Sequence, residues 1–319
     1  MKIVKTKLDS TGLYNLFDMK CIEISNTTIF DIFIKKDKDY VIIIEAGTKI
    51  TQVLYDKLNK QEALYIDKRD VTKQVLSPKT LKYHIKFNQD NVEKRLNILY
   101  DVNTQIFEKY LNNKDNKIDI KDMELLINSV IYLINYDNDF VKNTMPYFTN
   151  KYNLAKHSLH VSFYAVKLGH LLNYSDNQLA LLGLSSLLHD IGYKKIDQSI
   201  LNKEDKHTDD DTKQIFNHCR YSVEIAKQNG INDTNILDAL MHHHERYDGS
   251  GYPHGLRQKD MSDFASILSI CDVFDALTNH RPHRQEHSSF EALKLMLQDS
   301  VMLNQFNQKY LHLALKSLQ

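Results

Sequence analysis

Apolar residues recur at helical spacing over most of the chain beyond residue 90. They predict one helix over 91–112 and another over 123–136, separated by the charged loop 113–117. After residue 150 the same spacing continues almost without interruption. It predicts helices in the following order: about 155–172, 176–189, 210–229, 234–244, 262–279, 289–299 and 304–317. The whole chain has only nine glycines and four prolines, so we expect a mainly α-helical protein.

The first 85 residues follow a different pattern. Two runs rich in β-branched and aromatic residues, 28–34 and 40–44, flank the polar segment 35–39 and predict a β-hairpin. An amphipathic helix over 51–58 and a third short strand over 63–66 follow. We interpret this stretch as a small α+β module for regulation or docking. The expected domains are this module over 1–85, a helical connector over 86–150 that couples it to the rest or packs two chains together, and a C-terminal all-helical bundle over 151–319.

Composition and charge narrow the classes of function. The 41 basic and 41 acidic residues give a formal net charge of zero, so no electrostatic surface for a DNA or RNA polymer is expected. No apolar run approaches the roughly 20 residues of a membrane span, and the first residues lack the apolar core of a signal peptide. The three cysteines, Cys21, Cys219 and Cys271, show no disulfide pattern and fit a reducing compartment. These features predict a cytoplasmic location.

Histidine is concentrated in the second half of the chain, where fourteen of the fifteen histidines lie from His157 onward. Three of them, His242, His243 and His244, are consecutive at the expected end of a helix. A loop with three of the nine glycines follows them directly. Neighbouring helical residues point about 100° apart, so His243 and His244 suit two adjacent metal ions better than a single one.

A second pair with ligand chemistry is His189-Asp190, which closes an apolar helix. The imidazole offers a nitrogen ligand, and the two oxygens of an aspartate can bridge two cations. On its own this dipeptide is a weak signal. Its weight comes from further candidates on other predicted helices: His157, His218, His243, His244 and Asp272.

Several separate blocks around these residues stand in a recognisable order. They are His157-Ser158, His189-Asp190-Ile191-Gly192, Ser199-Ile200-Leu201-Asn202-Lys203, His218, His243-His244-Glu245, Asp248-Gly249-Ser250-Gly251-Tyr252-Pro253, Asp272-Val273-Phe274-Asp275-Ala276-Leu277 and Arg281-Pro282. In this order they resemble the HD-GYP family, a helical subclass of the HD phosphohydrolases associated with hydrolysis of cyclic di-GMP. The resemblance covers about 150–319, roughly half of the chain.

The resemblance implies a metal-dependent phosphodiesterase that opens cyclic di-GMP to pGpG, with GMP left open as a further product. It implies metal ligands at the following positions: His157, His189, Asp190, His218, His243, His244 and Asp272. His160 is the alternative to His157, but the family's His-Ser pair matches His157-Ser158. The role of His242, beside the pair, stays open. A solvated or packing role is expected for the other histidines of the second half: His170, His207, His254, His280, His283, His287 and His312.

Two divalent ions suit this chemistry. They can activate a bridging hydroxide as the nucleophile and neutralise the phosphodiester, which repels an incoming anion. Mixed His and Asp ligands fit several transition metals. We expect Fe or Mn, with Zn, Co and Ni as alternatives. His189 and Asp190 are the expected catalytic residues, together with Tyr193.

The substrate contacts are expected in two places. The loop residues Gly251, Tyr252 and Pro253 are expected to shape the pocket. Tyr252 would present its ring to a guanine or its hydroxyl to a phosphate, or else pack in the core. Arg281 and Arg284 are expected to bind phosphate oxygens, with surface salt bridges as the alternative.

Two departures from the family pattern bear on activity. Tyr193 stands where the family usually has a lysine, so a positive charge is missing and Lys194 is the candidate to replace it. Neither Lys151 nor Asn153 offers the carboxylate that some members use for a third metal, so we expect two ions.

Other functions and partners stay open at this point. A weakly active or inactive cyclic di-GMP receptor is one alternative to the enzyme. A phosphodiesterase for a related cyclic dinucleotide and another HD enzyme acting on nucleotides are two more. A homodimer is an open question, as is a diguanylate cyclase or other signalling partner.

Overall fold

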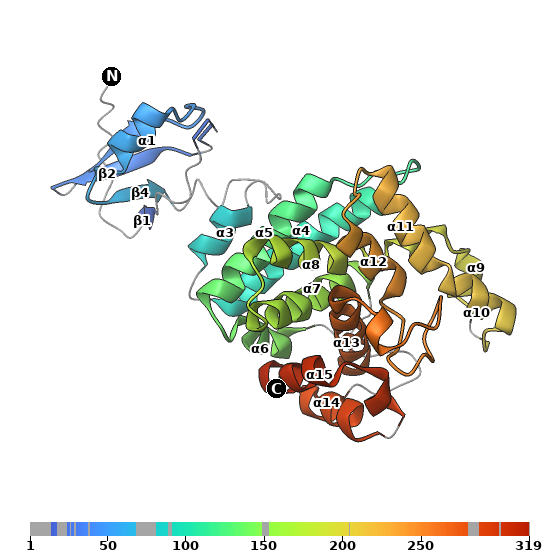
Figure 1. Ribbon diagram of the computed structural model, residues 1–319. Helices are drawn as coiled ribbons and strands as arrows, with labels where there is room; N and C mark the ends of the chain where they lie inside the picture. The colour runs from blue at the N-terminus through green and yellow to red at the C-terminus, as the bar shows by residue number, and fades with distance from the viewer. Residues whose placement is uncertain are drawn as a thin grey trace. The chain divides into compact units, whose positions relative to one another are not determined.

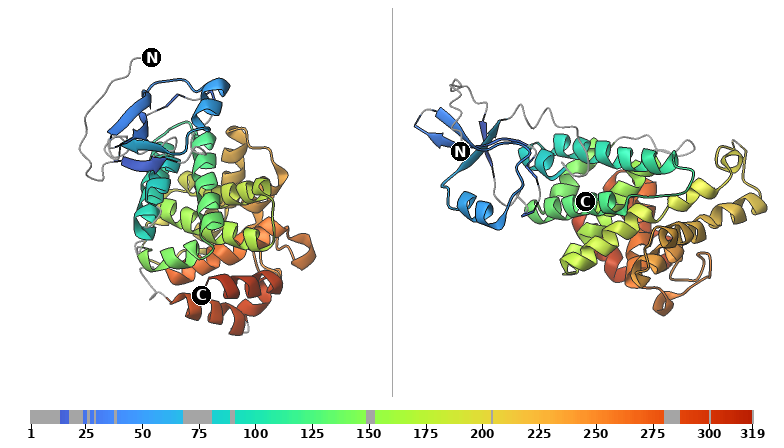
Figure 2. Two further views of the ribbon diagram at one scale, coloured as in Figure 1. Left: turned by 90° about the vertical axis from the view of Figure 1, so that its left-hand side faces the viewer. Right: turned by 90° about the horizontal axis from the view of Figure 1, so that it is seen from above.

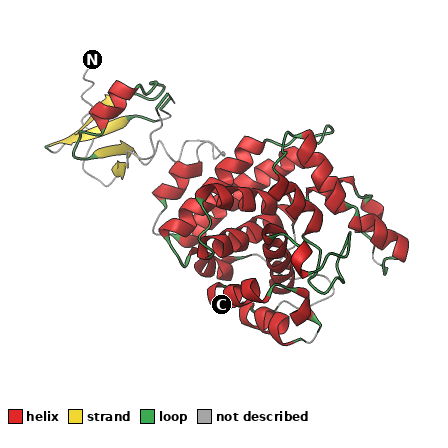
Figure 3. Cartoon of the chain, viewed as in Figure 1, coloured by secondary structure: helices red, strands yellow, loops and turns green. Residues whose placement is uncertain are grey.

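The computed structural model describes residues 14–17, 24–25, 27–28, 30–37, 39–67, 81–88, 91–148, 153–203, 205–279, 287–299 and 301–318. The chain divides into two compact units, residues 1–87 and 88–319 (Figure 1). The helices expected to form a connector therefore belong to the second unit. Figure 3 shows strands in the first unit, whereas the described part of the second consists of helices joined by loops.

The first unit is built on a four-stranded antiparallel sheet with the strand order β1-β4-β2-β3. The strands are β1 (Tyr14–Phe17), β2 (Ile32–Lys36), β3 (Asp39–Ile44) and β4 (Leu64–Asp67). The predicted hairpin is confirmed as β2 and β3, although the first of its strands begins at Ile32, four residues late. Sequence reasoning missed β1 and found β4 one residue early.

A short helix, α1 (Gln52–Leu58), lies between β3 and β4 in the chain. The Thr51 side chain caps it by accepting a hydrogen bond from the Leu54 N–H, as expected for a threonine before an amphipathic run. Leu58 joins the strand residues Ile32, Ile44 and Ile66 in one buried cluster. The unit also contains α3 (Leu81–Phe87), which the sequence pattern did not predict.

The second unit holds the remaining helices, and the mainly α-helical fold is confirmed. Its longer helices are α4 (Val92–Leu111), α5 (Ile120–Tyr136), α7 (Leu154–Leu171), α8 (Asp176–Leu188), α10 (Asp209–Phe216), α11 (His218–Gln228), α12 (Thr234–His242), α13 (Asp263–Thr278), α14 (Ser289–Gln298) and α15 (Gln308–Ser317). Shorter pieces are α6 (Phe140–Thr144), α9 (Gln198–Leu201) and the 3₁₀ turns η2 (Met145–Tyr147), η3 (Ile191–Lys195), η4 (Gln258–Asp260) and η5 (Met302–Gln305). No helix of the described residues is long and apolar enough to cross a membrane.

The helix α7 forms the centre of the second unit. Every residue from His157 to Gly169 is buried, so this helix has no solvent face. Helix α8 packs along α7, and α4 and α5 cover the pair on one side. Helices α12 and α13 pack on α8 and α7 as well, and the view from above in Figure 2 shows them across the central pair from α4 and α5. The two histidines near the start of α7 therefore lie deep in the bundle.

The single helix expected over 210–229 is instead two helices, α10 and α11, that meet at Asn217. The His218 side chain explains the break, because its Nδ1 lies 2.8 Å from the Ile215 carbonyl oxygen and engages it. That carbonyl would otherwise serve the ladder of a continuous helix. As a result, His218 is the first residue of α11 and its ring turns into the bundle.

Candidate metal centre

The ends of four helices and the middle of a fifth bring the seven predicted ligands together in one cluster. His157 comes from the first turn of α7, His189 and Asp190 follow α8, and His218 begins α11. His243 and His244 follow α12, and Asp272 lies in the middle of α13. Side chains separated by more than a hundred positions in the sequence thus meet within a few ångströms.

Four ligand atoms form a first group at this centre. The Nε2 atom of His157 lies 3.2 Å from Nε2 of His189 and 3.3 Å from Oδ1 of Asp272. The Oδ2 atom of Asp190 lies 3.5 Å from Nε2 of His157 and 3.2 Å from Nε2 of His189. This group offers two nitrogens and two oxygens within reach of one ion.

The other oxygen of Asp190 faces a second group. Its Oδ1 atom lies 3.3 Å from Nε2 of His218 and 3.6 Å from Nε2 of His243, and these two nitrogens lie 3.3 Å apart. His244 lies beside this group, with its Nδ1 atom 3.6 Å from Oδ2 of Asp272. Asp190 is therefore shared between the two groups, one oxygen to each.

The backbone fixes which nitrogen of three histidines faces the centre. Nδ1 of His189 lies 2.7 Å from the Ser186 carbonyl oxygen, and Nδ1 of His243 lies 3.0 Å from that of Leu240. His218 makes the same contact with the carbonyl three residues before it. A carbonyl only accepts, so Nδ1 must carry the proton and Nε2 keeps its lone pair for a cation.

Asp275 performs the corresponding task for His157. Its Oδ2 atom lies 2.7 Å from Nδ1 of His157, and its Oδ1 atom lies 3.1 Å from Nδ1 of His160. His160 is buried, and its Nε2 lies 2.6 Å from the Tyr100 hydroxyl. His160 therefore lies behind the first group, between Asp275 and α4. Asp275 was not predicted as a site residue, although it follows Asp272 by three positions and so shares its helix face.

The centre contains polar atoms that protein groups leave unsatisfied. Oδ1 of Asp190 and Nε2 of His244 are buried and have no hydrogen-bond partner. Such atoms are costly to bury unless something else binds them. A cation held by histidine nitrogens and aspartate oxygens would satisfy both needs, so the residues present fit a metal-binding centre.

Electrostatics at the centre also favours added positive charge. Burial opposes the charged form of His157, but hydrogen bonds with Asp190, Asp272 and Asp275 outweigh it and raise its pKa well above the usual value. At His243 the effect of burial prevails and lowers the pKa to about 4. This imidazole is therefore neutral near pH 7 and able to coordinate a cation. The carboxylates of Asp190 and Asp272 have lowered pKa values because the surrounding histidines oppose the effect of burial.

Gly192 and Ser222 hold the two ligand-bearing segments together. The Gly192 N–H donates to the Ser222 hydroxyl, and that hydroxyl donates to the His189 carbonyl oxygen at 2.7 Å. A Cβ atom on Gly192 would lie 2.0 Å from the His218 carbonyl oxygen, so only glycine allows this approach. This contact explains the glycine in His189-Asp190-Ile191-Gly192 and sets the distance between His189 and His218.

The glycine-rich loop after His244 is tied to the buried Glu245 carboxylate. Oε1 of Glu245 accepts a hydrogen bond from the His254 N–H at 2.7 Å, and Oε2 accepts one from the Leu256 N–H at 2.9 Å. Gly251 packs on the chain before the loop, where a Cβ atom would lie 2.4 Å from the His244 carbonyl oxygen. The expected substrate residues Gly251 and Tyr252 therefore lie next to the metal ligands.

The Tyr252 ring is enclosed by two other rings. It stacks on Phe216 with the ring centroids 3.6 Å apart and on His244 with the centroids 4.7 Å apart. Two rings stacked on the same face at these centroid distances would overlap, so Phe216 and His244 lie against opposite faces of Tyr252. Both faces are occupied, which leaves the hydroxyl edge. The Tyr252–Pro253 peptide bond is cis, and Pro253 is exposed.

The remaining predicted site residues have different positions. Tyr193 stacks on the His218 ring with centroids 4.2 Å apart and thus lies at the second group. The Lys194 ammonium donates to the carbonyl oxygens of Tyr110 and Asn113 at the end of α4, so its charge is already engaged there. Arg281 and Arg284 lie outside the described residues.

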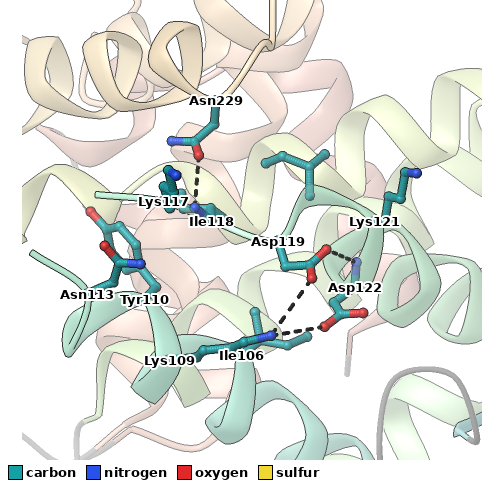
Figure 4. Close-up of a pocket in the computed structure, with 11 residues that line it drawn as sticks. Ile106, Lys109, Tyr110, Asn113, Lys117, Ile118, Asp119, Lys121, Asp122 and Asn229 are labelled. Carbon is teal, nitrogen blue, oxygen red and sulfur yellow. Dashed lines mark hydrogen bonds and ion pairs between the residues drawn. The ribbon is translucent and has the colours of Figure 1, made fainter. Parts of the chain in front are cut away.

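A cavity of about 420 Å³ lies at this end of α4 (Figure 4). Its lining includes Lys109, Tyr110, Asp122 and Asn229, and none of the seven predicted ligands. The Tyr110 hydroxyl donates to the Ile191 carbonyl oxygen at 2.9 Å, which ties this region to the residue after Asp190. The cavity is therefore separate from the metal centre, although one hydrogen bond connects their walls.

Among the predicted ligands, His244 and Asp272 have the most exposed side chains. They are 15% and 10% exposed, whereas the side chains of His189, His218 and His243 have no exposed surface. A ligand can therefore reach the centre at His244 and Asp272, close to Tyr252, which stacks on His244.

This fold and centre define a helical domain of the HD type with a buried His and Asp cluster. A family model described as an HD domain matches residues 139–302, just over half of the chain. The chain therefore belongs to the HD domain family.

Two curated proteins resemble part of the chain. A cyclic di-GMP phosphodiesterase of Pseudomonas aeruginosa is 35% identical over 140 residues, 44% of this chain and 34% of that protein. A 3'3'-cGAMP-specific phosphodiesterase of Vibrio cholerae is 32% identical over 142 residues, 44% of this chain and 31% of that protein. The chain thus spans about a third of the length of these relatives.

A solved structure shares the fold. An HDG"Y"P protein from Bdellovibrio bacteriovorus aligns with a TM-score of 0.60 and 18% identity, covering 95% of this chain and 98% of that one.

Proposed function

We propose that this chain is a metal-dependent phosphodiesterase that opens cyclic di-GMP to pGpG, with GMP left open as a further product. The observation that carries the proposal is the position of Asp190, whose two oxygens face two separate groups of histidine nitrogens. Such sharing is what a pair of divalent ions requires. The cofactor proposed is two divalent ions, Fe or Mn, with Zn, Co and Ni as alternatives.

The relatives support a cyclic dinucleotide as the substrate. The relatives from Pseudomonas aeruginosa and Vibrio cholerae carry the names of cyclic di-GMP and cyclic GMP-AMP phosphodiesterases. Both substrates present a phosphodiester between two nucleosides in a ring. The centre of this chain is suited to that group, because divalent ions bound there would neutralise the phosphate and lower the pKa of an attacking water.

The protein's own residues divide the remaining tasks. The proposed ligands are His157, His189, Asp190 and Asp272 at the first group, and Asp190, His218 and His243 at the second, with His244 beside it. Of these side chains, His244 and Asp272 are the most exposed, so the phosphodiester would enter there.

Positioning of the substrate falls to the residues at this open edge. Tyr252 is proposed to contact the substrate through its hydroxyl, since Phe216 and His244 occupy its faces. Tyr193 is proposed to hold the His218 ring by stacking. Arg281 and Arg284 remain the proposed phosphate contacts. A substrate contact by Lys194 would require its hydrogen bonds to α4 to break, so we do not assign it one.

The test is hydrolysis by metal-loaded protein. The full chain, purified without oxygen and loaded with Fe(II) or Mn(II), should convert cyclic di-GMP to pGpG resolved by chromatography, and His189→Ala should abolish this. His312→Ala is the matched control, because this exposed histidine on α15 lies outside the centre. A parallel assay with 3',3'-cyclic GMP-AMP tests the substrate. Faster hydrolysis of that compound would replace cyclic di-GMP as the substrate, and no hydrolysis of either at full metal loading would refute the function.

The remaining assignments are proposals of the same kind. The module of residues 1–85 is proposed to regulate the C-terminal residues 151–319 through the segment 86–150, in the cytoplasm. A homodimer and a diguanylate cyclase or other signalling partner are proposed assemblies. Size measurement of the purified chain with and without cyclic di-GMP tests the first of these.

A further inference from the structure

A cysteine lies at the second group of ligand atoms. Cys219 follows His218 in the first turn of α11 and is buried. Its Sγ atom lies 3.5 Å from Nε2 of His218. Donor atoms of His218, Cys219, His243 and His244 all lie within 4.8 Å of one another. The second group of ligand atoms, which faces Oδ1 of Asp190, therefore contains a sulfur beside its nitrogens.

Two distances that involve Nε2 of His218 match a four-coordinate metal site. With metal–nitrogen bonds of about 2.0–2.1 Å and metal–sulfur bonds of about 2.3 Å, a tetrahedral ion separates two nitrogens by about 3.3–3.4 Å and a nitrogen from a sulfur by about 3.5–3.6 Å. The observed separations are 3.3 Å between Nε2 of His218 and Nε2 of His243, and 3.5 Å between Nε2 of His218 and Sγ of Cys219. The sulfur is thus spaced as a ligand of the same ion would be.

Asp190 gives independent evidence for an ion at this position. Its Oδ1 atom is buried without a hydrogen-bond partner, and it lies 3.3 Å from Nε2 of His218 and 3.6 Å from Nε2 of His243. This oxygen supplies a fourth ligand atom beside the two nitrogens and the sulfur. A buried acceptor without a partner destabilises the fold, and a bound cation would remove this unfavourable free energy.

The simpler role for Cys219 is that of a small buried side chain with a weak S–H donor. In the neutral, metal-binding form of both imidazoles, however, the available protons do not satisfy this group. Nδ1 of His218 and Nδ1 of His243 carry the ring protons toward backbone carbonyls, so both Nε2 atoms are acceptors. With Oδ1 of Asp190 they form three acceptors, and the thiol offers one proton. At most one acceptor is served, whereas a cation would serve all three and the sulfur.

We propose that the Cys219 thiolate is a ligand of the ion held by His218, His243 and Oδ1 of Asp190. This inference rests on the two-metal centre of the proposed function. The thiol proton passes to water when the ion binds. The two positions then differ in kind, with two nitrogens and two oxygens at the first and a soft sulfur at the second. The second position should prefer Zn or Co more strongly than the first.

The chain contains a matched control. Cys271 is also buried and also adjoins a predicted ligand, Asp272, yet it belongs to none of the groups of donor atoms found among the described residues. Serine replaces the sulfur of either residue with an oxygen of similar reach. Cys219→Ser and Cys271→Ser therefore differ in whether a metal ligand is removed.

Cobalt provides a readout that does not depend on activity, since a thiolate bound to Co(II) absorbs in the near ultraviolet by charge transfer. The full-length chain, stripped of metal and kept without oxygen, is titrated with Co(II) while the bound metal is counted. We expect the absorption to grow with one of two bound equivalents and to persist in Cys271→Ser. In Cys219→Ser it should be lost, with cobalt affinity at one position reduced at least about tenfold.

The wild-type spectrum decides the proposal even if a variant folds poorly. Two bound cobalt ions without charge-transfer absorption would overturn the thiolate ligand, as would absorption that persists in folded Cys219→Ser. Cys219→Ala gives a second variant with no oxygen, and it should also lack the band. Hydrolysis by protein whose cobalt form lacks the charge-transfer band would refute the thiolate ligand and leave the proposed function intact. The band without hydrolysis by Mn- or Fe-loaded protein would refute the proposed function and leave the thiolate ligand intact.

Discussion

Replacing Asp275 with asparagine tests whether the residues behind the ligands control the metal centre. Burial opposes the charged form of Asp275, but His160 and His157 outweigh it and lower its pKa to about 2, so the group is an anion near pH 7. Its two oxygens bind Nδ1 of His157 at 2.7 Å and Nδ1 of His160 at 3.1 Å. An asparagine keeps the shape but has one acceptor oxygen, so it can retain only one of these bonds and has no charge.

The expected size of the effect follows from the role of Asp275. Removing a carboxylate that orients a ligating histidine typically weakens metal binding about 10- to 100-fold, or about 1.4–2.8 kcal/mol. Only the ion that binds His157 should be affected, because His218 and His243 take their orientation from backbone carbonyls. Competition with a chelator that changes colour on binding Mn(II) measures both affinities.

The matched control is Asp263→Asn, which makes the same change on the same helix. Asp263 accepts a hydrogen bond from the Tyr310 hydroxyl at the start of α13, away from the ligands. We expect one of two Mn(II) affinities to fall in Asp275→Asn and neither to fall in Asp263→Asn. Equal loss at both positions in Asp275→Asn, or less than a twofold change at each, would refute the reasoning.

Substitutions at three further positions test how the ligands and the loop are held. Gly192→Ala should lower the melting temperature and weaken metal binding, because its Cβ would lie 2.0 Å from the His218 carbonyl oxygen. Such overpacking costs about 1–3 kcal/mol or more. A melting temperature that calorimetry finds unchanged would contradict the close contact. Glu245→Ala should destabilise the chain by about 2 kcal/mol or more, because two N–H groups lose their acceptor. Glu245→Gln should be less destabilising. Equal free energies of unfolding for the two variants in a denaturant titration would argue against this role. Tyr193→Phe should keep the stack on His218 and the bound metal, whereas Tyr193→Lys should lose metal. Equal metal content of the two variants by elemental analysis would count against a positioning role of Tyr193.

The spacing of apolar residues was sufficient to predict the helical fold, and the family resemblance selected the seven candidate ligands. Amphipathic spacing identifies a helix such as α4 because one face must be buried. Histidine and aspartate at helix ends are few enough to be singled out, as His189 and Asp190 were. The resemblance in motif order then selected His157 over His160, and the structure places His160 behind the first group of ligand atoms.

The parts that could not be predicted depend on contacts between distant residues. The break between α10 and α11 arises from the His218 ring bonding a backbone carbonyl, which apolar spacing does not reveal. Asp275 is one of many acidic residues until its helix face is known. The enclosure of Tyr252 depends on Phe216, which comes from another helix more than thirty positions earlier. Lys194 is drawn to carbonyls of α4 that no local pattern connects with it.

The central claim is that Asp190 joins two metal ions, and anomalous diffraction from Mn(II)-soaked crystals tests it most directly. We expect two anomalous peaks about 3.5–4 Å apart, one beside Oδ2 with His157, the other beside Oδ1 with His218. A single peak at saturating Mn(II), or two peaks that do not share Asp190, would contradict the account.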